Sequence, residues 1–142
     1  MIKTIRTYDK KNIILVGTPV WSQDVAADSP IKGYSNLMYT FHFYAATHKE
    51  MYREKVKAAV KKGLPVFVSE FGISESSGNG SIDKKEANTW IQFLKKNKIS
   101  YVCWSLSNKD ESCSLLKSSS TRTGNFRKTD LSAAGRWYQA VK

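Results

Sequence analysis

The chain has 142 residues, which is the size of one domain and short for a complete barrel enzyme. Apolar residues make up 41% of the composition and charged residues 25%, so a disordered chain is excluded and a packed core is expected. The net charge of +11 by itself would favour a nucleic-acid partner. The lysines, however, cluster where helices would present their solvated faces, so we expect no nucleic-acid partner.

Short apolar segments alternate with longer amphipathic ones along the chain. The predicted strands are Asn12–Pro19, Leu37–Ala45, Pro65–Gly72 and Ser100–Ser107. Nearly continuous apolar strands that are separated by helices are typical of parallel sheets covered on their outer face. The sequence therefore predicts an α/β fold with four parallel strands and outer helices.

Two helices are predicted from capping boxes, in which a small polar residue is followed three residues later by a glutamate. Thr47 and Glu50 form the first, which opens a helix that ends at Gly63, and Asp83 and Glu86 form the second. Helical segments are also expected over residues 1–12 and 132–142. None of them reaches the roughly 18 apolar residues that cross a bilayer, so no membrane partner is expected.

Polar and aromatic residues gather at or just beyond the carboxyl ends of the four predicted strands. They are Trp21 and Gln23, His42 and Tyr44, Glu70, and Trp104 with Lys109 and Glu111. In a (β/α)8 barrel this is the edge at which the chemistry takes place. Glu70 stands out, because a carboxylate beside an apolar strand is costly unless it is paired or needed.

Four motifs in chain order carry a family resemblance: "GTPVWSQDV", "YTFHFYAATH", "VFVSEFG" and "CWSLSNKDES". Together they resemble glycoside hydrolase family 5, in its bacterial endoglucanase (cellulase) branch. The resemblance implies strands five to eight of a TIM barrel, so that residues 1–142 form a single half-barrel domain. It also implies a secreted full-length protein, although no signal peptide opens this chain and its own localisation is left open.

The resemblance implies that Glu70 is the catalytic nucleophile of a retaining glycosidase, which attacks the anomeric carbon of a sugar. His42 and Tyr44 are two residues apart, so their side chains share one face of a strand. By resemblance, His42 hydrogen-bonds around the reacting sugar and Tyr44 holds the carboxylate of Glu70. From the residues alone, a histidine inside an apolar strand is more often a core residue.

The remaining site residues are expected to bind β-glucan or a cello-oligosaccharide. By resemblance, Trp104 is the sugar platform beside the cleavage point, Lys109 and Glu111 bind sugar hydroxyls before the scissile bond, and Trp21 and Gln23 lie on the leaving-group side. No metal or organic cofactor is expected, because two carboxylates suffice for the reaction. Cys103 and Cys113 form no metal-binding pattern, and their disulfide state is left open.

The family's acid/base glutamate belongs to an Asn-Glu-Pro motif, and none of the three prolines in this chain follows a glutamate. We therefore expect weak or no hydrolysis by the chain alone. Half a barrel leaves unpaired strand edges and an uncovered inner face, so we expect two copies to close an eight-stranded barrel as a homodimer. The alternatives are a non-catalytic glucan-binding half-barrel and, from the charge alone, a nucleic-acid binder.

Overall fold

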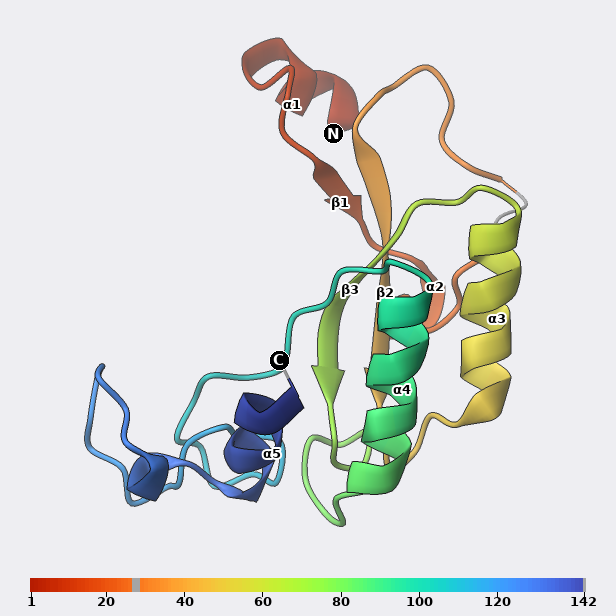
Figure 1. Ribbon diagram of the computed structural model, residues 1–142. Helices are drawn as coiled ribbons and strands as arrows, with labels where there is room; N and C mark the ends of the chain where they lie inside the picture. Colours follow the sequence, from red (N-terminus) through yellow and green to blue (C-terminus); the bar gives the residue numbers. More distant parts are fainter. Residues whose placement is uncertain (27–28, 142) are drawn as a thin grey trace.

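The computed structural model describes residues 1–26 and 29–141. At its centre is one parallel sheet with the strand order β1-β2-β3. The strands are β1 (Ile14–Val16), β2 (Leu37–Tyr44) and β3 (Val66–Gly72). The helices are α1 (Ile2–Tyr8), α2 (Pro19–Ser22), α3 (Glu50–Lys61), α4 (Lys84–Lys96), the short 3-10 helix η1 (Lys128–Asp130) and α5 (Ala133–Val141). Helices α3 and α4 lie side by side along one face of the sheet (Figure 1).

The fourth predicted strand is not a regular strand, so the expectation of four strands was wrong. Residues 100–104 do run alongside β3, and Tyr101 forms a single parallel bridge with Val68. The Val102 N–H donates to the Val68 carbonyl, but the next bond skips ahead, from the Trp104 N–H to the Phe71 carbonyl. The ladder breaks because β3 bulges between these two bonds, and regular pairing cannot continue across a bulge.

The connections also differ from the expected alternation of strands and helices. Within residues 17–26 and 29–36, the four-residue α2 is the one helix between β1 and β2. Helix α3 begins two residues later than the Thr47 capping box predicts, because its N-cap is Lys49, which makes no side-chain cap. Thr47 instead accepts a hydrogen bond from the Ser76 N–H at 2.9 Å. The cap of α4 was predicted correctly, since Asp83 accepts from the Glu86 N–H.

The core is an aromatic stack between the sheet and α4. Phe43 packs on Trp90 with ring centroids 4.0 Å apart and on Phe71 at 5.1 Å, and all three side chains are fully buried. The indole N–H of Trp90 donates to the carbonyl of His48 at 2.7 Å, so its polar atom is satisfied. This bond fixes the loop after β2 to the core.

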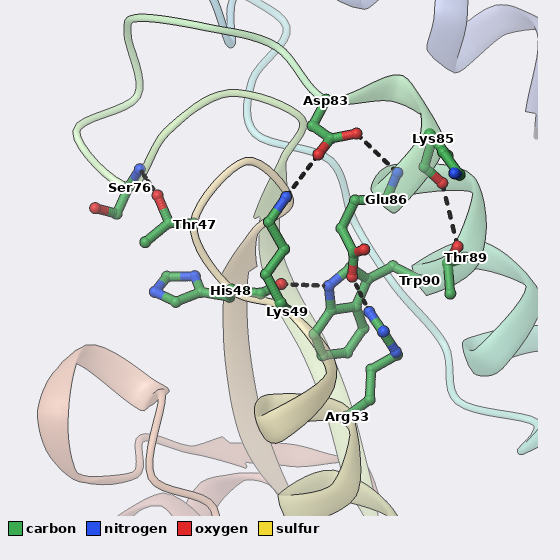
Figure 2. Close-up of polar contacts among 10 residues, drawn as sticks. All are labelled: Thr47, His48, Lys49, Arg53, Ser76, Asp83, Lys85, Glu86, Thr89 and Trp90. Atoms are coloured by element: carbon green, nitrogen blue, oxygen red, sulfur yellow. Dashed lines mark hydrogen bonds and ion pairs between the residues drawn. The ribbon is translucent and has the colours of Figure 1, made fainter.

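Charged side chains join α3 to α4 over this core (Figure 2). Lys49 pairs with Asp83 at 2.6 Å, and Arg53 pairs with Glu86. The Arg53 guanidinium also lies 5.3 Å from the centre of the Trp90 ring, at cation–π distance. The Arg53–Glu86 pair is largely buried, so water screens it less than a surface pair and it contributes to holding the two helices in register.

The opposite face of the sheet is much less covered. Leu15 is 42% exposed, and Met38 and Phe67 are partly exposed. The residues next to Met38 in β2 and next to Phe67 in β3 point to the other face and are buried. Beside β3, Val102 and Trp104 are about half exposed. In the part of the chain that the structure describes, no helix has the length and apolarity needed to cross a membrane.

Candidate active site

A bulge in β3 turns Glu70 toward the open face of the sheet. Phe41 of β2 pairs with Val68, but the next residue, His42, pairs with Glu70, so Ser69 is the extra residue. Strict alternation would place Glu70 on the helix side together with Val68. The bulge shifts it to the side of His42, and bulges of this kind commonly re-aim side chains next to active sites.

Two side chains of β2 contact the Glu70 carboxylate. The Tyr44 hydroxyl donates to Glu70 Oε1 at 2.8 Å, and His42 Nδ1 lies 3.7 Å from Oε2. The other His42 nitrogen, Nε2, hydrogen-bonds the Ser69 hydroxyl at 2.8 Å, so the bulge residue orients the imidazole. Burial, reinforced by the hydrogen bond to Glu70, raises the pKa of Tyr44 far above its usual value, which keeps Tyr44 protonated and able to donate.

Glu70 opens into a cavity of about 430 Å³ at the carboxyl end of β2 and β3. Its walls are formed by Trp21, Gln23, His42, Tyr44, His48, Glu70 and Ser76. The structure thus brings together five of the predicted site residues: Trp21, Gln23, His42, Tyr44 and Glu70. Glu70 carries the one carboxyl group among the described residues of this wall.

The turn that carries Trp21 is anchored to β2 by hydroxyl groups. Ser22 Oγ lies 2.6 Å from Thr40 Oγ1, and the Thr18 hydroxyl donates to the Thr40 carbonyl at 3.0 Å. Val20 and Trp21 have φ near +50°, a left-handed conformation that non-glycine residues rarely adopt. The anchored turn leaves the Trp21 indole 84% exposed at the cavity, where a flat apolar ligand surface could stack on it.

The other three predicted site residues lie outside the cavity wall. Trp104 is 48% exposed, and its N–H donates to Phe71, which places its backbone beside the end of β3. Lys109 and Glu111 pair with each other at 2.7 Å on the following loop. Their hydrogen bond raises the pKa of Lys109, so the lysine stays charged.

Sequence reasoning missed two cavity residues, His48 and Ser76. Both lie in loops that follow strands, and the segment around His48 was interpreted as the start of a helix. The structure ties these loops together through the Ser76 N–H and the Thr47 hydroxyl. Further polar residues after the carboxyl ends of β2 and β3 were the available signal.

The described residues hold no group of three or more histidine, cysteine or acidic side chains placed to bind a metal ion. Cys103 and Cys113 are both free thiols rather than a disulfide. Burial raises the pKa of the Cys103 thiol to about 12, which keeps it in the unreactive protonated form. Neither cysteine lines the cavity with Glu70.

Both histidines of the chain lie in this site, and they should make its stability depend on pH. Burial lowers the pKa of His48, and burial outweighs the opposing pull of Glu70 to lower the pKa of His42. The unfolded chain therefore binds more protons than the folded chain as the pH falls below the ordinary histidine value, about 6.5. We expect the urea concentration at the midpoint of unfolding to decrease as the pH is lowered from about 7.5 to about 5.5.

The same titration in His48→Gln is the control for this expectation. The variant removes one of the two shifted groups, so its midpoint should change less with pH than that of the unmodified chain. A midpoint that is constant, or that rises on acidification, would contradict the sign.

Comparison with known proteins identifies the family. Residues 1–110 match the family described as cellulase (glycosyl hydrolase family 5). The chain belongs to glycosyl hydrolase family 5. The resemblance drawn from the four motifs is thereby confirmed. Similar curated proteins include an endoglucanase from Clostridium saccharobutylicum, 46% identical over 95% of this chain, and endoglucanase A from Butyrivibrio fibrisolvens, 39% identical over 96%. The chain spans 30% and 32% of these two proteins.

Solved structures of the family give the same result for the fold. A structure from Cytophaga hutchinsonii superposes with a TM-score of 0.94 at 40% identity, covering 98% of this chain and 46% of that chain. The catalytic domain of Thermobifida fusca endoglucanase Cel5A gives 0.88 at 32% identity, with 98% and 48% covered. Both superpositions cover nearly all of this chain and less than half of the matched chain, so the parallel sheet of this chain corresponds to part of a larger TIM barrel.

Proposed function

We propose that this chain is the nucleophile-bearing half of an endo-β-1,4-glucanase and that Glu70 is its nucleophile. The observation that carries the proposal is the Glu70 carboxylate, held by Tyr44 beside His42 and opening into a cavity at the carboxyl edge of a parallel sheet. Packing of the core does not require a partly exposed glutamate at this position, or a bulge in β3 that turns the Glu70 side chain toward the cavity. A family 5 chain with this arrangement is equipped for covalent attack on a sugar.

The hydrogen bond from Tyr44 occupies Glu70 Oε1 and leaves Oε2 as the attacking oxygen. In the first step Oε2 bonds to the anomeric carbon, while the bond from that carbon to the leaving-group oxygen breaks. The departing oxygen takes a proton from a general acid, and water later releases the sugar from Glu70. Tyr44 also stabilises the carboxylate that is regenerated in the second step, because a donated hydrogen bond favours the ionised form.

The general acid must be a second carboxyl group, roughly 5 to 5.5 Å from the first in retaining enzymes. Glu70 is the one acid among the described residues that line the cavity. This favours a second candidate function, in which the chain binds glucan without cleaving it. Hydrolysis in the complete enzyme then depends on an acid that these residues do not provide.

An activated cellobioside separates the two candidate functions. A dinitrophenolate leaving group departs without protonation, and a fluorine next to the anomeric carbon slows release of the sugar, so the covalent intermediate accumulates. We expect one equivalent of dinitrophenolate per chain and one added cellobiosyl mass on the peptide that contains Glu70. Glu70→Gln should show neither. Binding of cello-oligosaccharide without labelling would support the glucan-binding function, and absence of both would refute the proposal.

Replacing Gly72 should slow this labelling by displacing Tyr44. A Cβ atom on Gly72 would lie 2.7 Å from two carbons of the Tyr44 ring, which is closer than real contacts allow. The buried ring must move, and its hydroxyl moves away from Glu70. We expect Gly72→Ala to lower the labelling rate about tenfold and to cost about 1–3 kcal/mol of stability. Gly17→Ala is the matched control, since nothing lies within 4 Å of that position; equal rates in the two variants would contradict the role of Tyr44.

The substrate is proposed to be β-glucan or a cello-oligosaccharide. A variant of Thermobifida fusca endoglucanase Cel5A, 31% identical to this chain, is known in complex with cellotetraose. Trp104, Lys109 and Glu111 would bind the sugars before the scissile bond, and Trp21 and Gln23 those after it. Because polymeric glucan is a substrate outside the cell, we also propose that the full-length protein is secreted.

We further propose that residues 1–142 form one half-barrel domain, equivalent to strands five to eight, and that two copies pair to complete a barrel. The chain corresponds to 46% of the Cytophaga hutchinsonii structure, so two copies have about the length of one. Four large apolar side chains are 42–66% exposed in β1 and in the segment after Tyr101: Leu15, Val102, Trp104 and Leu106. A two-fold pair would bury these side chains and both sheet edges.

Size-exclusion chromatography with light scattering tests this pairing, and we expect the mass of a dimer at micromolar concentration. Leu106→Lys should shift the mass toward the monomer, because it places a charge in the buried interface. A folded monomer of the unmodified chain would refute the proposed dimer. In such a dimer the two Glu70 carboxylates stand four strands apart, wider than the retaining spacing.

A further inference from the structure

His48 is a buried histidine in the wall of the cavity that contains Glu70. The residue is 3% exposed, yet its ring lines the cavity together with Trp21 and Gln23. Figure 2 shows this ring extending away from Trp90, on the other side of the loop from the core. A buried imidazole is costly unless its nitrogens are satisfied, so each nitrogen needs a partner.

The first ring nitrogen is an acceptor inside the protein. The Tyr44 N–H donates to His48 Nδ1 at 2.8 Å. In a parallel sheet alternate N–H groups face opposite neighbours, and the Tyr44 N–H points away from β3, toward an edge that β1 does not reach. Nδ1 therefore accepts the hydrogen bond that a carbonyl of a neighbouring strand would otherwise accept. The backbone N–H of His48 donates in turn to the Tyr44 carbonyl at 2.7 Å.

This contact fixes the tautomer of the ring. Because Nδ1 accepts a hydrogen bond, the proton of the neutral imidazole is on Nε2. Burial lowers the pKa of His48, which keeps the ring neutral near pH 7. Among the described residues no hydrogen-bond partner is found for Nε2, so its N–H is left for whatever enters the cavity.

The ring is also held rigidly. Tyr52 packs edge-on against it, with centroids 4.6 Å apart and planes at 64°. The His48 carbonyl accepts from the Trp90 indole, which anchors the backbone to the core. A donor held in place from both sides loses little conformational entropy when a ligand binds.

We propose that His48 is a sugar-binding residue whose Nε2–H donates to a hydroxyl of the sugar bound next to Trp21 and Gln23. A neutral, rigid donor suits a neutral hydroxyl, and Trp21 supplies the flat apolar surface on which a pyranose ring can stack. The carboxamide of Gln23 adds adaptable polar contacts on the same wall. The identity of the ligand as a glucan rests on the function proposed above.

Two isosteric variants separate the two nitrogens of the ring. In His48→Asn the side-chain oxygen takes the place of Nδ1 and still accepts from Tyr44, but the donor into the cavity is lost. In His48→Gln the side-chain amide takes the place of Nε2 and keeps that donor, but the acceptor for Tyr44 is lost. Binding and stability should therefore respond oppositely in the two variants.

The measurement is calorimetric titration of the full chain with cellotetraose. We expect binding to weaken about five- to tenfold in His48→Asn, the usual size of one neutral hydrogen bond, and less than about threefold in His48→Gln. Imidazole NMR of the free chain should show the Nε2–H tautomer of His48, and ligand should shift Nε2 more than Nδ1.

Each result decides between the two proposals. If the unmodified chain binds cellotetraose and His48→Asn binds it equally well, the role of His48 is refuted while the glucan function stands. An Nδ1–H tautomer would also refute it. Covalent labelling of Glu70 with no effect of either His48 variant on binding would lead to the same conclusion. If the unmodified chain neither binds cellotetraose nor is labelled, both proposals fail together.

Discussion

The chain by itself should hydrolyse a soluble cellulose derivative at least about a hundredfold more slowly than its 46% identical relative, the endoglucanase from Clostridium saccharobutylicum. Protonation of the leaving oxygen by a positioned acid contributes about 10²- to 10⁴-fold to such reactions. If Glu70 is the nucleophile, as proposed above, the described residues that line its cavity still offer no second carboxyl group to protonate the leaving group. Binding and nucleophilic attack would remain, and acid catalysis would be lost.

The assay is release of reducing ends, run for the unmodified chain, for Glu70→Gln and for the relative at equal concentration. Glu70→Gln is the matched control, because it keeps the shape of the side chain and reports turnover by contaminants. The activated dinitrophenyl cellobioside should narrow the gap between the chain and the relative, since its leaving group needs no proton. Glu70-dependent turnover of the polymer at the rate of the relative would show that this chain, alone or as a dimer, does supply an acid.

The sequence predicted the positions of the polar residues better than their orientations. The two-residue spacing of His42 and Tyr44 predicted that their side chains share one face of a strand, and in the structure both lie at the Glu70 carboxylate. The same alternation, applied to β3, puts Glu70 on the helix side with Val68. The bulge at Ser69 instead places Glu70 on the same side as His42, and the pattern of apolar and polar residues does not predict this bulge.

The fourth strand shows the limit of apolar pattern in a different way. Residues 100–107 have the composition of a buried strand, and part of the segment does hydrogen-bond β3. Regular pairing also needs a partner without irregularities, and that condition depends on β3 rather than on this segment. The composition therefore predicted an extended segment, and the structure shows this segment hydrogen-bonded to β3 without a regular ladder.

The loop after β2 was missed because one residue pattern fits two structures. Thr47 and Glu50 have the spacing of a capping box, and local pattern alone favours a helix start at Thr47. In the folded chain the Thr47 hydroxyl accepts from Ser76, and His48 accepts from Tyr44. Ser76 is distant in the sequence and Tyr44 belongs to the preceding strand, so these two contacts could not be predicted from the local sequence. The position of His48 after the carboxyl end of β2 was the one signal of its place in the cavity.

Replacing Gly135 with alanine should cause a large loss of stability, although it adds a single methyl group. Gly135 lies in the first turn of α5, where alanine would ordinarily be preferred over glycine by about 1 kcal/mol. A Cβ atom there would overlap the carbonyl oxygen of Leu115 and lie 2.9 Å from its carbonyl carbon. That carbonyl accepts from the Ser132 N–H at 3.1 Å, and the Leu115 N–H donates to Ser105, so the backbone cannot yield cheaply.

We expect Gly135→Ala to lower the free energy of unfolding by about 2–4 kcal/mol, measured by urea denaturation. Gly124→Ala is the matched control, because nothing lies within 4 Å of that position, and its stability should stay close to that of the unmodified chain. The Leu115 N–H also donates to the Ser105 carbonyl, next to the proposed sugar-binding residue Trp104, so we expect the variant to bind cello-oligosaccharides more weakly where it still folds. If the variant is as stable as the unmodified chain or more stable, the helix propensity of alanine outweighs the contact with the Leu115 carbonyl, and α5 does not pack closely against Leu115.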